Sequence, residues 1–326
     1  KGVLICLDVT DEVLNEAKNL KCNLIIAHHP LIFSGIKKIN DSSYPSSCVY
    51  KAIQNGINIY AIHTNLDNVS QGVNGKIADI LNLNSREILK PLNNLLKLAV
   101  YVPNNHLCSV RDAVFEAGGG HIGLYSNCSF SSEGIGTFLP NDGSAPFSGK
   151  LNELSTEKEQ KLETILPNFK LNEVIAAIKL SHPYEEVAYD IYPVLNASKF
   201  GAGLIGELDK EISEIEFLNH VKNKFKASVI RYTGLLNKKI KRVAVCGGAG
   251  SFLINNAISK NADIFITSDF KYHQFFDANN QILIADIGHY ESEQFTIDLL
   301  RDILMKKFTN FAIRLTSVNT NPINYL

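Results

Sequence analysis

Three features that would assign a protein to a broad class are missing from this sequence. No apolar run in its 326 residues approaches the ~20 residues that a membrane-spanning helix requires, so no membrane association is expected. The formal net charge is −1, and aromatic residues are not interleaved with Lys or Arg as a stacking platform. Both observations argue against nucleic acid as a partner.

Paired cysteine motifs are also missing. The six cysteines form no CxxC or CxxxC pair, and Cys6 and Cys246 lie inside apolar runs, where buried free thiols are common. No disulfide framework is therefore predicted, and a reducing, cytoplasmic location is expected. What remains is an ordinary globular composition, with 45% hydrophobic and 20% charged residues and room for one to three domains.

Two parts of the chain repeat the same order of elements. Near the N-terminus, an apolar strand (2–8) is followed by a helix (10–20) that Thr10 or Asp11 could cap, and by a second strand that ends in His28 and His29. Near the C-terminus the order returns. The corresponding segments are 241–251 (strand and turn), 252–262 (helix), 263–273 (strand with a polar end) and 281–293 (strand with a polar end). Two related α/β halves are therefore predicted.

The segment between the halves has a different pattern. Its elements follow a β-α-β-β-α-β order, which is typical of the ferredoxin-like fold. The predicted strands are 96–103, 124–130, 134–140 and 185–195, and the predicted helices are 106–120 and 170–183. We expect an α/β protein whose two similar halves form one metal-binding domain, interrupted by a ferredoxin-like α+β insert. The predicted segments are 1–94, 95–197 and 198–326.

The strand that ends in His28 and His29 raises the question of a metal site. Adjacent imidazoles at the carboxyl end of a strand can point to different places, which suits two ions better than one. By themselves, two such histidines are more often ordinary surface residues. The polar ends of other predicted strands change this weighting, because His and an acid recur there with a spacing of four. These pairs are His63/Asp67, His273/Asp277 and His289/Glu293.

Residues separated by four positions share one face of a helix, so each pair could bind one ion together. Ligands in open α/β sheets bind beyond the carboxyl ends of the strands, where these pairs are predicted to lie. Imidazole and carboxylate together suit zinc, iron or manganese. A metal site is therefore the favoured interpretation.

The stretch CGGAGS, Cys246 to Ser251, allows two interpretations that the sequence does not separate. Gly247, Gly248, Gly250 and Ser251 could offer free backbone N–H groups to a phosphate at a helix start. They could equally form only a tight turn between a strand and a helix. The stretch is not GxxxxGK[ST], so a P-loop is not supported.

Five stretches of the sequence together resemble motifs of the Nif-three-like family, and the resemblance covers nearly the whole chain. These stretches are AHHPLIF, AIHTNLDN, VCGGAGS, ITSDFKYH and DIGHYESE. Many bacterial members are labelled GTP cyclohydrolase I type 2 homologues. One departure is Ser268 before Asp269, where the family usually has Gly-Asp. The resemblance implies a dinuclear metal centre whose bridging ligand is Glu293. The implied ligands are His28, His29, Asp67, His289 and Glu293, and the residues implied to line the same cleft are His63, Asp269 and His273.

The resemblance also implies an insert of the PII/CutA type and a homo-oligomer in the form of a toroidal hexamer. The expected cofactors are two divalent ions per chain, with zinc favoured and iron or manganese as alternatives. His28 and His29 are expected to bind different ions, the partners being Asp67 for one ion and His289 for the other. The expected function is a metal-dependent hydrolase of a nucleotide or phosphoester. The alternative is an oligomeric, metal-binding regulatory scaffold without turnover.

Overall fold

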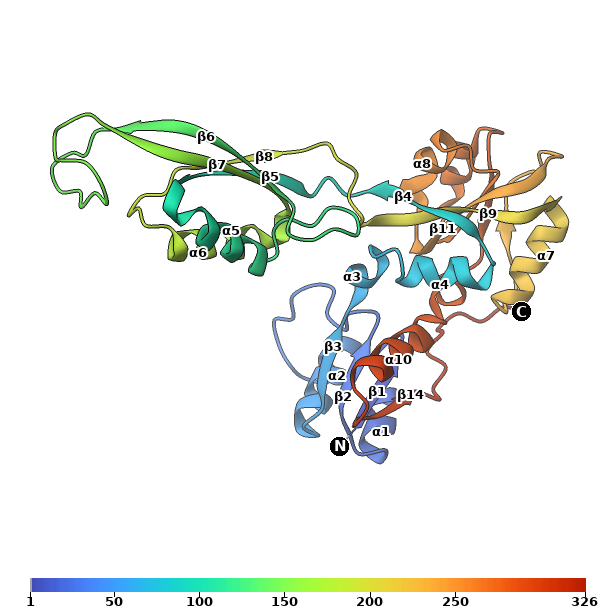
Figure 1. Cartoon of the computed structure of the whole chain (residues 1–326). Helices are drawn as coiled ribbons and strands as arrows, with labels where there is room; N and C mark the ends of the chain where they lie inside the picture. Colours follow the sequence, from blue (N-terminus) through green and yellow to red (C-terminus); the bar gives the residue numbers. More distant parts are fainter. Residues whose placement is uncertain (1) are drawn as a thin grey trace. The chain divides into compact units, whose positions relative to one another are not determined.

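The computed structural model describes residues 2–326, and it divides them into two compact units. One unit joins the chain up to Pro91 to Lys199–Leu326, and the other is Leu92–Ser198. Within the described residues all six cysteines are free, and no helix has both the length and the apolar character needed to cross a membrane. The larger unit is a mixed α/β structure with two sheets, and the smaller one contains a third sheet (Figure 1).

The first sheet of the larger unit has four parallel strands in the order β14-β1-β2-β3. The helix between β1 and β2 is α1 (Asp11–Asn19), and the side chain of Thr10 accepts a hydrogen bond from the backbone N–H of Val13 at 3.2 Å. This confirms the predicted cap. The strands of this sheet are β1 (Gly2–Cys6), β2 (Cys22–Ala27), β3 (Asn58–Ala61) and β14 (Ala312–Leu315).

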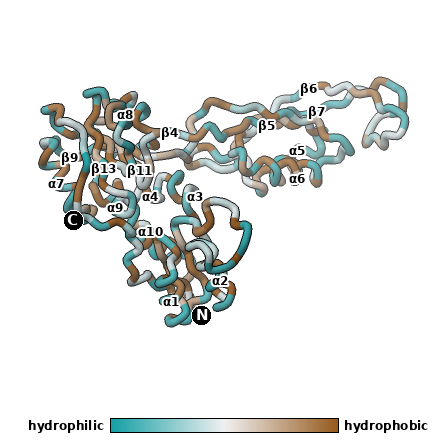
Figure 2. The backbone as a smooth tube through the Cα atoms, turned by 180° about the vertical axis from the view of Figure 1, so that it is seen from behind, coloured by the Kyte–Doolittle hydropathy of each residue, from teal (hydrophilic) through white to brown (hydrophobic). Residues whose placement is uncertain are grey.

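The second sheet has six strands in the order β10-β13-β12-β11-β9-β4. Its central strands β11, β12 and β13 are parallel, as expected for the repeated half, whereas β9 runs antiparallel to β11. Figure 2 shows hydrophobic residues concentrated along these central strands. The strands are β4 (Asn84–Pro91), β9 (Gly201–Ser213), β10 (Arg231–Tyr232), β11 (Lys239–Ala249), β12 (Ile264–Ser268) and β13 (Leu283–Asp286).

The two sheets do not divide the chain at the predicted segment boundaries. β4 comes from the first predicted half but pairs with β9 of the second, and β14 comes from the second half but pairs with β1. The sequence does not reveal this exchange, because the pairing of edge strands depends on contacts between residues far apart in the chain. As a result the chain crosses between the two sheets more than once.

Longer helices of the larger unit pack against the two sheets, and two short helices follow directly after strands. The helix α3 follows β3, and α9 follows β13, each with five residues. The helices other than α1 are α2 (Tyr44–Gln54), α3 (His63–Asp67), α4 (Val73–Ile80), α7 (Glu214–Lys224), α8 (Ile254–Ser259), α9 (His289–Glu293) and α10 (Thr296–Lys307).

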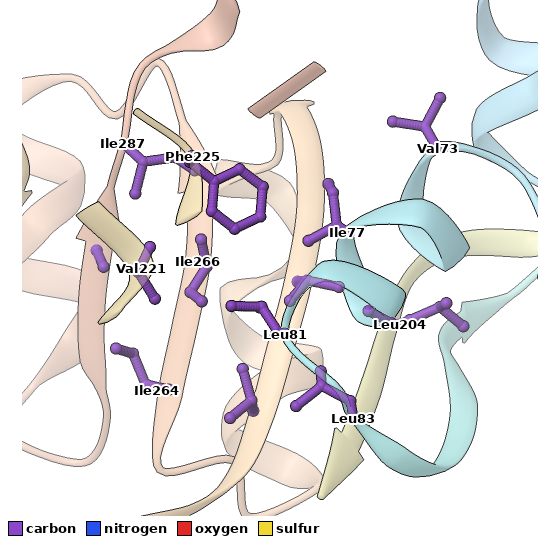
Figure 3. Packing of buried hydrophobic residues seen from close by; sticks show 14 of the residues in the cluster. Val73, Ile77, Leu81, Leu83, Leu204, Val221, Phe225, Ile264, Ile266 and Ile287 are labelled. Atoms are coloured by element: carbon purple, nitrogen blue, oxygen red, sulfur yellow. The ribbon is translucent and has the colours of Figure 1, made fainter. Parts of the chain in front are cut away.

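The main core of this unit lies between the facing sides of the two sheets. Successive residues of a strand point to opposite faces, so Val3 and Ile5 of β1 belong to this core, whereas Leu4 and Cys6 pack under α1 and α2. Figure 3 shows Ile77 on α4 directed toward the strands of the second sheet. Burial on both faces explains why β1 is a continuous apolar run.

The smaller unit has the predicted β-α-β-β-α-β order, but two of its strands were assigned wrongly. The predicted strands 124–130 and 134–140 each overlap part of a single strand, β6, and the next strand, β7, was missed. β7 begins with the charged run TEKEQK and is apolar only in its second half, so it lacks the expected alternation. The elements are β5 (Leu95–Pro103), α5 (Leu107–Glu116), β6 (Ser129–Phe138), β7 (Ser155–Pro167), α6 (Leu171–Ser181) and β8 (Tyr189–Pro193).

Candidate metal centre

The paired imidazoles lie directly beyond the end of β2. The backbone N–H groups of His28 and His29 donate to the carbonyl oxygens of Cys6 and Leu7, and the chain bends at both residues. The two imidazoles lie side by side, and their Nε2 atoms approach different oxygens of the Glu293 carboxylate. Their ring centroids are 4.8 Å apart, and the ring planes are inclined by 54°. His28 is fully buried, and His29 is 9% exposed.

Two short helices bring acids and further histidines to the same place. β3 is followed by α3, which begins at His63 and ends at Asp67, and β13 is followed by α9, which begins at His289 and ends at Glu293. Gly288 precedes α9 with a φ of 93° and leaves room that a Cβ atom would fill against a neighbouring carboxylate. Both turns therefore present a histidine and an acid at a spacing of four, as the sequence indicated.

The carboxylate of Glu293 lies between two sets of donor atoms. Its Oε2 is 2.9 Å from His29 Nε2 and 3.1 Å from His289 Nε2, and the two nitrogens are 3.2 Å apart. Its Oε1 is 3.6 Å from His28 Nε2, which is 3.5 Å from Asp67 Oδ1. The structure thus brings together all five residues that the family resemblance implied as ligands.

Several of these atoms are buried without a hydrogen-bond partner among the described residues. They include both ring nitrogens of His28, Asp67 Oδ1 and Glu293 Oε2. Unsatisfied polar atoms in a protein interior are costly and rare, so a cluster of them calls for a missing partner. His28, His29 and Glu293 offer donor atoms close enough together to hold a metal ion, which would satisfy them.

A second layer of carboxylates fixes two of the imidazoles. His29 Nδ1 donates to Asp8 Oδ1 at 2.7 Å, and His289 Nδ1 donates to Asp269 Oδ2 at 2.6 Å. Each bond holds the ring so that its Nε2 faces Glu293, an arrangement common behind metal-binding histidines. Asp8 was not predicted as a site residue. The signal that could have found it is its position, because Asp8 is the polar residue that ends the first apolar run.

These contacts shift the pKa values within the cluster. Burial raises the pKa of Glu293, but the close imidazoles of His28, His289 and His29 outweigh it, and the net pKa lies well below the usual range. Burial lowers the pKa of His29, but the hydrogen bond to Asp8 and the nearby carboxylate of Glu293 raise it to about 9. The hydrogen bond to Asp269, helped by Glu293, raises the pKa of His289 to about 10. Without a metal, protons on these imidazoles balance the buried carboxylate.

His63 differs from the other histidines of the cluster. Its ring lies edge-on to the rings of His28 and His29, with centroids 5.6 and 5.5 Å away. Burial and the neighbouring imidazoles lower its pKa, so the ring is neutral. It lines a cavity of about 580 Å³, beside the donor atoms, together with Phe33 and Phe252. His63 is therefore placed to exchange a proton with a molecule in this cavity.

The glycines at the end of β11 serve the cluster in a different way from a phosphate loop. The N–H of Gly247 donates to Asn74 Oδ1 at 3.0 Å, and the N–H of Gly248 donates to Ser292 Oγ at 2.9 Å, so both donors are already engaged. A Cβ atom on Gly248 would come within 2.5 Å of Glu293 Oε1. The absence of a side chain at Gly248 lets Glu293 approach the backbone, so this glycine is explained without a bound phosphate.

The structure does not bring every implied residue to the cavity. Ser251 begins a short 3₁₀ helix directly after Gly250, and its Oγ accepts a hydrogen bond from the side-chain amide of Gln274. His273 is exposed, its ring contacts Tyr272 and Phe276, and it is not among the described residues that line the cavity. The pair His273/Asp277 therefore lies outside the cluster, although it follows the Ser268-Asp269 strand end and has the same spacing of four.

Comparisons with known proteins show which family the chain resembles over its length. The family described as Duf34/NIF3 (NGG1p interacting factor 3) matches residues 1–322. Proteins named "GTP cyclohydrolase 1 type 2 homolog" are similar to this chain: one from Halalkalibacterium halodurans is 41% identical, covering 99% of this chain and 89% of its own, and one from Bacillus subtilis is 40% identical, covering 100% and 89%. A solved structure of a Bacillus cereus protein related to NIF3 is 41% identical, with a TM-score of 0.78 over 99% of this chain and 89% of that one.

Proposed function

The chain belongs to the Duf34/NIF3 family, and we propose that it is a hydrolase that depends on two divalent metal ions. The observation that carries the proposal is that the two oxygens of Glu293 face different donor sets. His28, Asp67 and Glu293 Oε1 would hold one ion. His29, His289 and Glu293 Oε2 would hold the other.

The donor set fits zinc, with iron or manganese as alternatives. Every proposed ligand is an imidazole or a carboxylate, and the separations of 2.9 to 3.2 Å between donor atoms around Glu293 Oε2 suit a small ion. Cys246 lines the same cavity, but burial raises the pKa of its thiol to about 12. Its Sγ donates to the carbonyl oxygen of Gly247, and it is not proposed as a ligand.

Two bound ions would supply an activated water and offset negative charge on a reacting phosphoester or ring carbon. The protein's own contribution is position and proton transfer. His63 is neutral, lines the cavity and contacts the rings of two proposed ligands, so we assign it the role of proton acceptor. Asp269 contacts His289 and is proposed to orient it. His273 is not proposed to take part.

The proposed substrate is a nucleotide or another phosphoester. The relatives' name, "GTP cyclohydrolase 1 type 2 homolog", supports a nucleotide, although no residue of the cavity specifies guanine. Phe33 and Phe252 line the cavity and are 75% and 59% exposed, so either could contact a base. Thr64, Asn68 and Asn321 add uncharged polar groups to the same walls.

The test is a screen of nucleotides and phosphoesters with the zinc-, iron- or manganese-loaded full chain. Phosphate release and loss of the purine absorbance report the two reaction types. Turnover is expected in at least one metal form, and Glu293→Ala should abolish it. The matched control is Asp277→Asn, because Asp277 ends the same His-x3-acid spacing but lies on the exposed segment that carries His273. It should behave as the unchanged protein.

The alternative, a regulatory scaffold that binds metal without turnover, is an outcome of the same experiment. Two tightly bound ions without turnover of any probe would contradict the hydrolase and support the scaffold. Failure to bind metal after reloading would contradict both. The hexamer implied by the family resemblance remains a proposal, and the mass of the assembly in solution tests it.

A further inference from the structure

We propose that a second cavity, within the smaller unit, binds a small organic cation. The cavity has a volume of about 270 Å³ and is bordered by the end of β6, the loop 139–154, β7 and the segment that precedes β8. It lies wholly within Leu92–Ser198, so the proposal does not depend on the metal centre.

Aromatic rings form part of the wall of this cavity. The ring centroid of Tyr184 is 6.3 Å from that of Phe138 and 6.0 Å from that of Phe147, and all three residues line the cavity. Phe147 is 55% exposed, which is unusual for a phenylalanine that serves only to fill a core. Aromatic faces attract cations through the quadrupole of the ring, most strongly in a site shielded from water.

A buried carboxylate lies beside these rings. Glu159 is only 9% exposed, and its Oε1 accepts a hydrogen bond from the hydroxyl of Tyr184 at 2.9 Å. A Cβ atom on Gly136 would lie 2.3 Å from Glu159 Oε2, so the glycine of β6 is what leaves room for this carboxylate. None of the hydrogen bonds or ion pairs found among the described residues involves Oε2.

The charges around the cavity are of one sign. Glu159, Glu185 and Glu186 line it, whereas no Lys or Arg is among the described residues that do so. Lys161, two residues from Glu159 and on the same face of β7, instead directs its ammonium group to Glu163, at 3.6 Å. The mostly buried carboxylate of Glu159 therefore has no Lys or Arg partner among the described residues. A ligand that carries a positive charge would supply this partner.

The walls also decide which class of cation fits. Phe138, Leu139 and Pro146 give the cavity apolar surface that a bare metal ion would not use. A ligand with an apolar body and an ammonium group would bury its body against these residues and its charge against Glu159. Phosphate-bearing molecules would be repelled by the three glutamates. The ligand class therefore differs from the substrate proposed for the metal centre.

The test uses choline and its neutral carbon isostere, 3,3-dimethyl-1-butanol, as matched probes of one shape. Calorimetric titration of the full chain should detect choline binding in the micromolar to low millimolar range, and binding at least tenfold weaker for the alcohol. Glu159→Gln keeps the shape and the Tyr184 contact but removes the charge, so it should weaken choline at least tenfold. Glu116→Gln, on the exposed side of α5, makes the same change in net charge and should have no effect.

Phe147→Ala provides a second variant, since an exposed residue can be changed without risk to the core. It should weaken choline severalfold even if Glu159→Gln does not fold. The proposal is overturned if choline shows no binding up to 10 mM, if the alcohol binds as well as choline, or if neither Glu159→Gln nor Phe147→Ala weakens choline. None of these outcomes would bear on the hydrolase proposed above, because the substrate screen tests that proposal separately.

Discussion

The turns α3 and α9 have the same spacing and follow equivalent strands, yet they contribute differently to the cluster. In α9 both His289 and Glu293 lie among the donor atoms, 3.1 Å apart. In α3 only Asp67 does so, and His63 faces the cavity beside the other imidazoles. Sequence spacing therefore predicts which residues share a helix face, but not how many of them contact the same atom.

The cause of the difference lies outside the turns. Asp269 holds His289 through Nδ1 and raises its pKa, whereas the pKa of His63 is lowered by burial and by nearby imidazoles. His29, on the α9 side, is likewise backed by Asp8, but Nδ1 of His28, on the α3 side, has no hydrogen-bond partner among residues 2–326. The α9 side is therefore better organised before any ion binds, and we expect it to hold the tighter ion.

The largest effect on metal content is expected from replacing Glu293, whose carboxylate lies between the α3 side and the α9 side. Glu293→Gln should remove both ions, because Oε1 and Oε2 face different donor sets and an amide offers each of them less charge. Asp67→Asn should remove only the α3-side ion. Elemental analysis after reloading should give near zero for the first variant and near one for the second, with far-ultraviolet circular dichroism as the check on folding. Two ions retained by Glu293→Gln would refute the bridging role.

Particular residues show how much of the fold and of the candidate site could be predicted from the sequence. The strand ending in His28 and His29 and the two turns could be predicted because strand ends and i,i+4 spacings are local properties. Asp8 could not be assigned to His29, nor β14 to β1, because both pairings join segments far apart in the chain. β7 was missed because its first half is charged on both faces.

The glycine turn shows the same limit on a smaller scale. Free N–H groups on Gly247 and Gly248 would have supported a phosphate site, and only the fold reveals that Asn74 and Ser292 accept from them. The PII/CutA character of the insert, the hexamer and the number and identity of the ions stay predictions.

Replacing either of the two histidines that follow β2 should weaken only one of the two proposed ion sites. His28→Ala should weaken the α3-side ion, because His28 Nε2 lies near Asp67 and Glu293 Oε1. His29→Ala should weaken the α9-side ion, because His29 Nε2 lies near His289 and Glu293 Oε2. Zinc titration against a chelating dye should count one tight site in each variant. If a crystal structure with metal shows both imidazoles on one ion, the divergent arrangement is wrong.

A smaller effect is expected from the carboxylates behind the ligands. Asp269→Asn keeps the size of the side chain but weakens its hydrogen bond to His289, so the α9-side ion should bind about 10–100-fold more weakly. Asp8→Asn should act on the same ion through His29. Since both variants loosen one site, their effects should not add in the double variant. Competition with a chelator measures the affinities, and an equal loss at both ions would show that the sides are not independent.

The smallest effect on metal content is expected from His63, the residue that most clearly distinguishes α3 from α9. His63→Ala should leave two ions with unchanged affinity, because no donor atom of the two sets belongs to it, whereas His289→Ala should lose one. If His63 accepts a proton during hydrolysis, kcat should nevertheless fall by about 10²–10⁴-fold, with a smaller change in KM. Added imidazole should restore part of kcat, since the truncated side chain leaves space that opens to the cavity, and the addition should not help His289→Ala. A loss of metal in His63→Ala, comparable to that in His289→Ala, would show that the two turns bind alike and that the neutral imidazole of α3 is a ligand after all.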